Sequence, residues 1–165
     1  MPTATSELIR KAQAARAASR GLRSLSTASK NQALNAIADA LESEQAAILK
    51  ANALDMAAGR ESGVQEHLLE RLMLNEERLN GMALDVRTIV TLPDPVGESF
   101  DAQTLPNGLR VEHRRVPLGV IGAIYESRPN ITVDIAVLCM KSGNAVVLRG
   151  GKEATHSNKA LASLL

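Results

Sequence analysis

Apolar side chains recur at every third or fourth position through much of residues 1–95, which is the spacing of one face of an α-helix. Two stripes are clear: the first is Ala33, Leu34, Ile37, Ala38 and Leu41, and the second is Leu79, Met82, Val86, Ile89 and Val90. Asn75 precedes two glutamates and is expected to cap the second of these helices. We therefore predict a helical region over 1–95, with a break between helices marked by Gly59 and Gly63.

The pattern changes where the prolines begin. Pro93 and Pro95 are expected to end the last helix of this region, because proline lacks the amide donor and clashes with the preceding turn. Asn107-Gly108 then predicts a tight turn between two extended stretches. Both stretches are rich in polar and charged residues, so we expect a projecting β-hairpin over 96–115. A two-stranded ribbon is marginally stable alone, which makes a partner subunit one candidate for what covers it.

Residues 116–165 are interpreted as a strand, a helix, a second strand and the beginning of another helix. The strands are expected at 116–124 and 145–148, the connecting helix at 131–141, and the last helix is expected to run through Leu165. This order is a βαβ unit, in which the two strands are adjacent and parallel. Both strands are continuous apolar runs, which is typical of a sheet covered on both faces. The predicted fold class is therefore α/β.

Polar residues gather where each of these strands ends. The first group is Glu126, Ser127, Arg128 and Asn130, and the second is Arg149, Gly150, Gly151 and Lys152. Ligands of open α/β sheets bind outside the carboxyl ends of the strands, and cations beside a helix N-terminus favour a phosphate. The signal is not specific, because G-x-G-x-x-G is absent and Glu153 stands where a P-loop has Ser or Thr. Asn130 as a simple helix cap, with the two glycines as a simple turn, is the alternative interpretation.

Composition narrows the possible function classes. The chain has 165 residues, and its net charge of +1 gives no reason to expect nucleic acid or an anionic membrane as a partner. No apolar run approaches the length of a membrane span. The single cysteine suits a reducing compartment, and the three histidines lack metal-ligand spacing, so we expect no metal site. The basic, Ala-rich N-terminus is compatible with a mitochondrial transit peptide, but we favour a surface helix because helical sequence continues without a cleavage-like break.

The stretch VPLGVIGAIYESRPNITVDIAVLCMKSGNAVVLRGGKEA resembles the cofactor-binding core of the gamma-glutamyl phosphate reductases, a family within the aldehyde dehydrogenase superfamily. LPDPVG and the Asn107-Gly108 hairpin resemble the same family, so the resemblance covers essentially the whole chain. It implies a Rossmann-like sheet of the aldehyde dehydrogenase type. Residues 1–95 would be the helical part of the cofactor-binding domain, 96–115 an oligomerisation arm, and 116–165 the first βαβ unit of the NADP-binding domain.

The resemblance also implies an activity. This is the NADPH-dependent reduction of L-glutamate 5-phosphate to L-glutamate 5-semialdehyde, with release of phosphate, in proline biosynthesis. A homo-oligomer, a cytoplasmic location and a functional link to glutamate 5-kinase are implied with it.

The roles of individual residues follow from the same resemblance. Asn130 matches the asparagine whose amide helps to form the oxyanion hole. Lys152 falls near an acidic residue that selects NAD in many relatives, so a cation there suits the 2′-phosphate of NADP. Arg149 takes the place of a lysine that contacts the adenosine ribose, and Gly150 and Gly151 let the backbone approach the cofactor. Glu126 and Ser127 are expected along the cofactor, and Arg128 is expected to face a carboxylate or phosphate of the substrate.

The chemistry of this family requires a cysteine nucleophile, which forms a thioester that accepts hydride. The single cysteine, Cys139, lies in an apolar helix and is expected to be buried and unreactive. The family's nucleophile lies beyond the end of this chain, so we expect an N-terminal portion that is inactive by itself. Two alternatives stay open: another acyl or aldehyde dehydrogenase of the superfamily, and a non-catalytic nucleotide-binding or interaction module. YESRPN with LRGGKEA favours the glutamyl phosphate enzymes, because other relatives read closer to PWN and KPSE.

Overall fold

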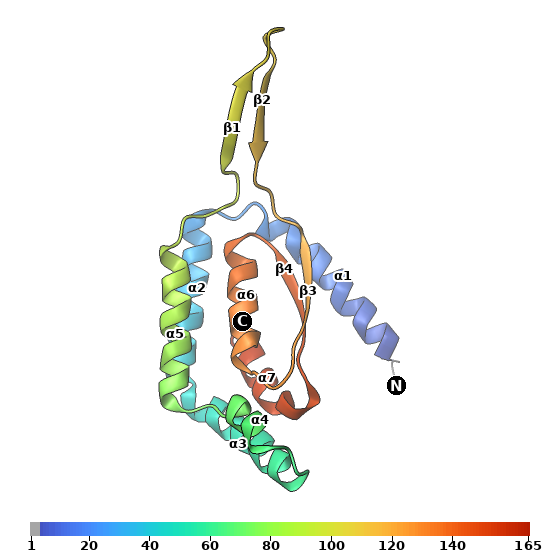
Figure 1. Cartoon of the computed structure of the whole chain (residues 1–165), viewed down its shortest axis with the longest axis vertical. Coiled ribbons are helices and arrows are strands. Elements are labelled where there is room, and N and C mark those ends of the chain that lie inside the picture. Colours follow the sequence, from blue (N-terminus) through green and yellow to red (C-terminus); the bar gives the residue numbers. More distant parts are fainter. Residues whose placement is uncertain (1–3) are drawn as a thin grey trace.

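The computed structural model describes residues 4–165, with side chains described from residue 7. Figure 1 shows a layer of helices beside a small parallel sheet, with a hairpin standing out at one end. The helices of the first part are α1 (Ala4–Leu22), α2 (Thr27–Ser43), α3 (Gln45–Glu61), α4 (Glu66–Leu72) and α5 (Glu76–Thr91). The remaining elements are β1 (Ser99–Thr104), β2 (Arg110–Arg114), β3 (Val120–Ile124), α6 (Asn130–Lys141), β4 (Ala145–Arg149), the 3₁₀ turn η1 (Lys152–Ala154) and α7 (Thr155–Ala162).

The main core lies between α2, α5 and α6, which pack against one another. Both predicted apolar stripes face this core, with Leu34, Leu41 and Leu79 fully buried. The Asn75 side chain accepts a hydrogen bond of 2.8 Å from the backbone amide of Arg78, which confirms the predicted cap of α5.

The break between α3 and α4 lies at Gly63, whose φ is +73°, and not at Gly59. Gly59 is inside α3. Packing explains why this position is glycine, because a Cβ on residue 59 would lie 2.7 Å from Cδ2 of Leu69 on α4.

The hairpin over 96–115 is confirmed. The α5 helix ends at Thr91, before the prolines, and β1 and β2 pair antiparallel from Ser99 opposite Arg114 to Thr104 opposite Arg110. Every residue of the two strands is exposed. Figure 1 shows the ribbon projecting from the body of the molecule.

Strands β3 and β4 pair in parallel, with Val120 opposite Ala145 and Ile124 opposite Arg149, and α6 connects them. The first strand is shorter than predicted. It begins at Val120 because Pro117 has no amide to donate and Gly119 has a φ of +108°.

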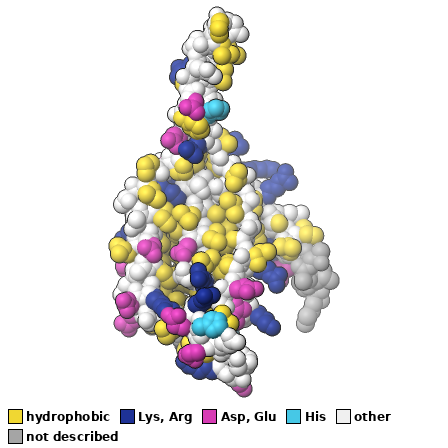
Figure 2. Space-filling model, in the orientation of Figure 1, with side chains coloured by type: hydrophobic (Ala, Val, Ile, Leu, Met, Phe, Trp, Pro, Cys, Tyr) yellow, Lys and Arg dark blue, Asp and Glu magenta, His cyan; other side chains and the backbone are white. Residues whose placement is uncertain are grey.

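The prediction of a sheet covered on both faces is confirmed for β4, which contacts both α1 and α6, and is wrong for β3 within residues 4–165. Residues along β3 alternate between exposed and half-buried, and Ile124 is 82% exposed. Among the described residues only β4 pairs with β3. Figure 2 shows hydrophobic side chains gathered over the middle of the face where β3 and α6 lie.

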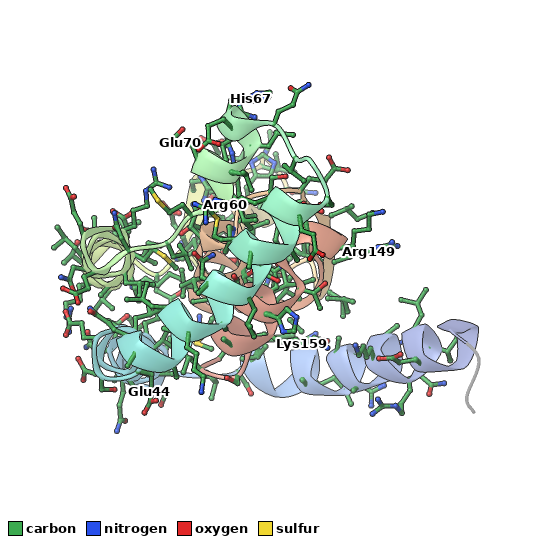
Figure 3. The ribbon with its side chains drawn as sticks, turned by 90° about the horizontal axis from the view of Figure 1, so that it is seen from below. Glu44, Arg60, His67, Glu70, Arg149 and Lys159 are labelled. Carbon is green, nitrogen blue, oxygen red and sulfur yellow. The ribbon has the colours of Figure 1, made fainter. Side chains whose placement is uncertain are left out.

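The last helix is also shorter than predicted, because α7 ends at Ala162 and Leu165 lies outside it. The α7 helix packs across α3, and Figure 3 shows α3 crossing this end of the molecule. The α1 helix contacts β4 but extends away from the body, which agrees with the predicted surface helix.

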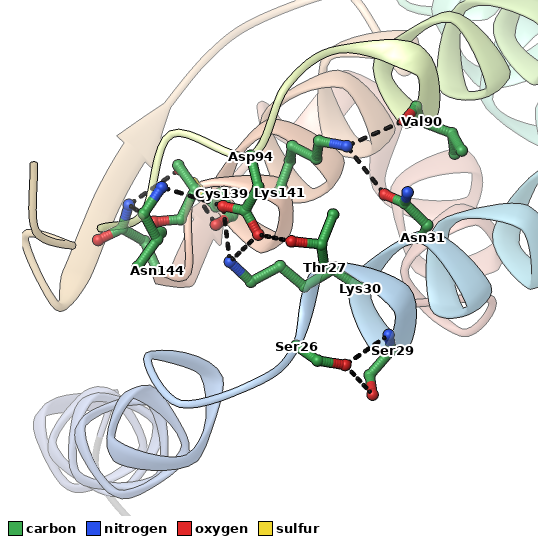
Figure 4. A network of polar contacts seen from close by, with 12 residues as sticks. Ser26, Thr27, Ser29, Lys30, Asn31, Val90, Asp94, Cys139, Lys141 and Asn144 are labelled. Carbon is green, nitrogen blue, oxygen red and sulfur yellow. Dashed lines mark hydrogen bonds and ion pairs between the residues drawn. The ribbon is translucent and has the colours of Figure 1, made fainter. Parts of the chain in front are cut away.

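A polar network joins the body to the base of the hairpin (Figure 4). Lys30 on α2 is fully buried, and its ammonium group lies 2.9 Å and 3.0 Å from the carboxylate oxygens of Asp94. The same carboxylate accepts hydrogen bonds from the Thr27 hydroxyl and the Val96 amide.

None of the helices in residues 4–165 is long and apolar enough to cross a membrane.

Candidate functional site

The ends of the two parallel strands meet at one edge of the sheet, as predicted. The amide of Tyr125, just after β3, donates a hydrogen bond of 3.1 Å to the carbonyl of Arg149 at the end of β4. The cavity at this edge has a volume of ≈ 340 Å³, which lies at the lower end of the range of ligand pockets. The strand-end pocket, as we call it, is lined by Ile124, Tyr125, Glu126, Arg149, Gly150, Gly151, Lys152 and Glu153. Five of the predicted cofactor residues are therefore neighbours in space.

Glu153 ties the two strand-end loops together. Its carboxylate accepts hydrogen bonds from the Ser127 amide, at 2.5 Å, and from the Ser127 hydroxyl, at 3.2 Å. Ser127 adopts a left-handed backbone conformation with φ of +47°, which aims its amide at this carboxylate. Burial alone would raise the pKa of Glu153, but hydrogen bonds from its own backbone and from Ser127 hold the pKa below its usual value. Ser127 is thus occupied within the chain.

The two glycines of the second loop are explained by contacts inside the chain. A Cβ on Gly150 would lie 2.1 Å from Nδ2 of Asn158, and a Cβ on Gly151 would lie 2.0 Å from the Glu153 carboxylate. Glycine is therefore needed at both positions so that these two side chains can reach their partners.

The N-terminus of α7 does not offer a free anion site, which corrects the prediction of a phosphate held at that helix end. The Asp55 carboxylate, 3% exposed on α3, accepts hydrogen bonds from the amides of His156 and Ser157 at 3.1 Å and 2.7 Å. It also accepts one from the Ser157 hydroxyl. A carboxylate of the protein thus occupies the place where sequence reasoning expected a phosphate.

Two cations of the strand-end pocket stay available for a ligand. Arg149 and Lys152 are exposed, and neither side chain forms a hydrogen bond or ion pair with any side chain that the structure describes. Figure 3 shows Arg149 at the outer margin of the molecule. A guanidinium and an ammonium beside a half-open pocket fit a phosphate of a nucleotide, while the Glu126 carboxylate could accept hydrogen bonds from ribose hydroxyls.

Asn130 does not line the strand-end pocket. It is the first residue of α6, and its amide Nδ2 donates a hydrogen bond of 2.9 Å to Oδ2 of Asp134 one turn later. It faces a second cavity of ≈ 300 Å³, the Asn130 pocket, which lies between the start of α6 and α4 and α5. That pocket is lined by Arg71, Met73, Leu74, Arg78, Gly81, Met82, Asp85 and Asn130. Asn130 is not the N-cap of α6, since Pro129 precedes the helix.

A short chain of hydrogen bonds fixes the loop between the two pockets. The Tyr125 hydroxyl lies 2.6 Å from Oγ1 of Thr132, and the Thr132 hydroxyl donates to Oδ1 of Asn158 at 3.0 Å. This chain joins the end of β3, the first turn of α6 and α7. Arg128, on the same loop, is exposed and lines neither pocket.

Cys139 is buried in α6, with 5% of its surface exposed, and burial raises the pKa of its thiol. A high pKa disfavours the thiolate, which is the nucleophilic form. The expectation of a buried cysteine is confirmed.

Comparison with known proteins decides the family. The sequence model of the aldehyde dehydrogenase family matches residues 1–165, which is the whole chain. The chain belongs to the aldehyde dehydrogenase family. Within it, the chain is 55% identical over 159 residues to a gamma-glutamyl phosphate reductase of Vibrio parahaemolyticus, covering 96% of this chain and 38% of the relative. It is 57% identical over 159 residues to a protein of the same name from Moorella thermoacetica, again covering 96% and 38%.

Solved structures of aldehyde dehydrogenase family members agree with this fold. The crystal structure of gamma-glutamyl phosphate reductase from Thermotoga maritima has a TM-score of 0.93 and 46% identity, over 96% of this chain and 38% of that one. The corresponding structure from Saccharomyces cerevisiae has a TM-score of 0.89 and 33% identity, over 99% of this chain and 41% of that one. The predicted fold, from helices through the hairpin to the parallel sheet, is confirmed. The chain spans about 38% of the length of the curated relatives that it matches.

Proposed function

We propose that this chain forms the NADP-binding portion of a reductase that converts L-glutamate 5-phosphate to L-glutamate 5-semialdehyde and phosphate. The observation that carries the proposal is the strand-end pocket, where two parallel strands deliver Arg149 and Lys152 to one rim. The relatives at 55% and 57% identity are named for this activity, and their likeness supports the substrate.

The residues of the strand-end pocket would divide the work of holding the cofactor, which supplies a hydride when bound. Lys152 would bind the 2′-phosphate of NADP, because its ammonium is exposed and forms no ion pair with a carboxylate among the described side chains. Arg149 would contact the adenosine ribose or its phosphate. Glu126 would accept hydrogen bonds from ribose hydroxyls, and the Glu153–Ser127 hydrogen bonds would keep the two loops at a fixed distance.

Asn130 would act on the substrate side. When a thiolate attacks the acyl carbon, negative charge develops on the carbonyl oxygen, and a positioned amide N–H stabilises that charge. The Asp134 carboxylate accepts one amide hydrogen of Asn130 and so fixes the orientation of the side chain, leaving the second hydrogen for the substrate. Burial raises the pKa of Asp134. Because Cys139 is buried, we expect the attacking thiol to come from the further sequence that the relatives possess.

The hairpin and the substrate suggest the partners. We propose that β1 and β2 pack against a second copy of the chain, because the exposed ribbon carries Phe100, Leu109 and Val111 into solvent. The substrate is an acyl phosphate, so a kinase that phosphorylates the side-chain carboxylate of glutamate must supply it. A soluble, cytoplasmic enzyme is consistent with such a supply.

The test uses an extended form, meaning this chain joined to the further sequence that its relatives possess. Purified extended form is mixed with glutamyl phosphate, and oxidation of NADPH is followed by absorbance together with release of phosphate. We expect one phosphate released for each NADPH oxidised. Absence of oxidation with glutamyl phosphate, in a preparation that is folded by circular dichroism, would contradict the proposal.

A further inference from the structure

The Asn130 pocket contains more charge than an oxyanion site requires. Besides Asn130, its rim carries Arg71 from the end of α4, and Arg78 and Asp85 from α5. Met73, Leu74 and Met82 supply apolar surface between these groups. A cavity with an apolar wall and both signs of charge suits a zwitterion with a short hydrocarbon chain.

Of the two arginines, Arg71 is the one free to bind a ligand. The Arg78 guanidinium donates to the carbonyls of Glu70 and Met73 at 2.7 Å each, and it pairs with the Glu70 carboxylate at 2.8 Å. Arg78 therefore holds the loop between α4 and α5. Arg71 is exposed, and within residues 7–165 its side chain makes no hydrogen bond or ion pair. A guanidinium in this situation is well suited to a carboxylate.

Two carboxylates supply negative charge in or beside the Asn130 pocket. Asp85 lines the pocket, and Asp134 lies directly behind Asn130, to which it is hydrogen-bonded. Burial raises the pKa of Asp134, the hydrogen bond from Asn130 lowers it, and the charge of Asp85 raises it. Asp85 itself has no hydrogen-bond or salt-bridge partner in the part of the chain with described side chains. A ligand ammonium group would relieve this repulsion.

We propose that the Asn130 pocket binds the α-amino and α-carboxylate groups of an amino-acid substrate, with Arg71 on the carboxylate and Asp85 on the ammonium group. This inference rests on the proposed function in one respect, namely that Asn130 faces the reacting carbonyl. The pocket would then favour an acyl phosphate derived from an amino acid over a simple aliphatic one.

The experiment measures binding, so that it does not depend on turnover. Dissociation constants of four acids for the extended form are obtained by ligand-observed NMR. L-glutamate carries both groups, glutarate lacks the amino group, 4-aminobutanoate lacks the α-carboxylate, and butanoate lacks both. Each variant is compared with wild type and with the control Arg16→Gln, which removes an exposed arginine of α1 that lines no described pocket.

The variants should have separable effects. Arg71→Gln should raise the dissociation constants of L-glutamate and glutarate by about tenfold or more, because a charged hydrogen bond contributes roughly that much to affinity. The dissociation constant of 4-aminobutanoate should stay nearly unchanged. Asp85→Asn should raise the dissociation constants of L-glutamate and 4-aminobutanoate and leave that of glutarate unchanged. A Cβ at Gly81 would meet nothing within 4 Å, so the Gly81→Leu variant should fold. Its side chain should fill the pocket and raise the dissociation constants of all four acids.

The outcomes separate this inference from the proposed function. Equal dissociation constants of L-glutamate and butanoate for wild type, or equal losses for all four acids in Arg71→Gln and Asp85→Asn, would overturn the headgroup site. Oxidation of NADPH by glutamyl phosphate would still be measured in the same preparations. That reaction can persist when the headgroup site fails, and headgroup binding can persist when the reaction fails.

Discussion

The Glu153 carboxylate accepts hydrogen bonds from both the amide and the hydroxyl of Ser127, and it thereby joins the loop after β4 to the loop after β3. This clamp sets the width of the strand-end pocket, since the lining residues Glu126 and Lys152 adjoin the two clamp residues. The proposed cofactor site therefore depends on the hydrogen bonds between Glu153 and Ser127.

Removing the clamp should loosen the pocket without destroying the fold. In the 165-residue chain, Glu153→Ala is expected to lower the free energy of unfolding by roughly 1–3 kcal/mol, because two donors of Ser127 lose their acceptor. The measurement is urea denaturation followed by circular dichroism. The control is Glu126→Ala, which removes a neighbouring exposed carboxylate. Equal stability of the two variants would show that the clamp contributes nothing.

The contribution of the Glu153 carboxylate to stability should depend on pH. The pKa of Glu153 is held below its usual value of 4.5 in the folded chain, so its ionised form stabilises the fold above that pH. As the pH falls from 4.5 through the lower folded pKa, the stability difference between wild type and Glu153→Gln should shrink toward zero. Denaturation curves of both proteins at several pH values test this, and a difference that grows as the pH falls would contradict it.

The ion pair between Lys30 and Asp94 should contribute more to the stability of the fold than an exposed ion pair does. The Lys30 side chain is 1% exposed and that of Asp94 is 12% exposed, so removal of the carboxylate leaves a buried ammonium without a partner. We expect Asp94→Ala to lower the free energy of unfolding by about 3–5 kcal/mol.

The matched control for this pair is Asp39→Ala. It breaks the exposed pair with Arg87, in which the Asp39 side chain is 71% exposed, and should lower the free energy of unfolding by less than about 1 kcal/mol. Thermal or urea denaturation of both variants gives the comparison. A similar, small loss for both would show that Lys30 finds another partner.

Asn130→Ala should separate catalysis from cofactor binding. In the extended form we expect kcat to fall by about 10²–10³, because an amide of the oxyanion site is lost, while the KM for NADPH stays within twofold of wild type. The strand-end pocket, which does not include Asn130, is left intact. The control is Asn35→Ala, an exposed position on α2. An unchanged kcat would exclude Asn130 from the oxyanion role.

Much of the architecture could be read from the sequence because local signals agreed with one another. The stripe that includes Leu79 and Val86, the cap at Asn75 and the prolines after α5 all predicted the same helix. The Asn107-Gly108 turn fixed the hairpin, and apolar β3 and β4 around α6 fixed the parallel pair.

The details of the site depend on contacts between residues distant in the chain, which a sequence pattern does not reveal. Asp55 caps α7 across a separation of 102 residues, and Glu153 turns back to Ser127 across 26. Both are acids in ordinary helical or loop sequence, and their positions carried no signal for these contacts. The position of Asn130 in a separate pocket likewise follows from how α6 packs against α4 and α5.

The strand-end pocket as an NADP site is tested most directly by reversing the charge of Lys152. In the extended form, KM values for NADPH and NADH are measured for wild type, Lys152→Glu and the control Lys159→Glu, an exposed lysine on α7. We expect Lys152→Glu to raise the KM for NADPH by about tenfold or more, with the KM for NADH nearly unchanged, because only NADPH carries the 2′-phosphate. An unaltered preference in Lys152→Glu, matching that of Lys159→Glu, would contradict the account.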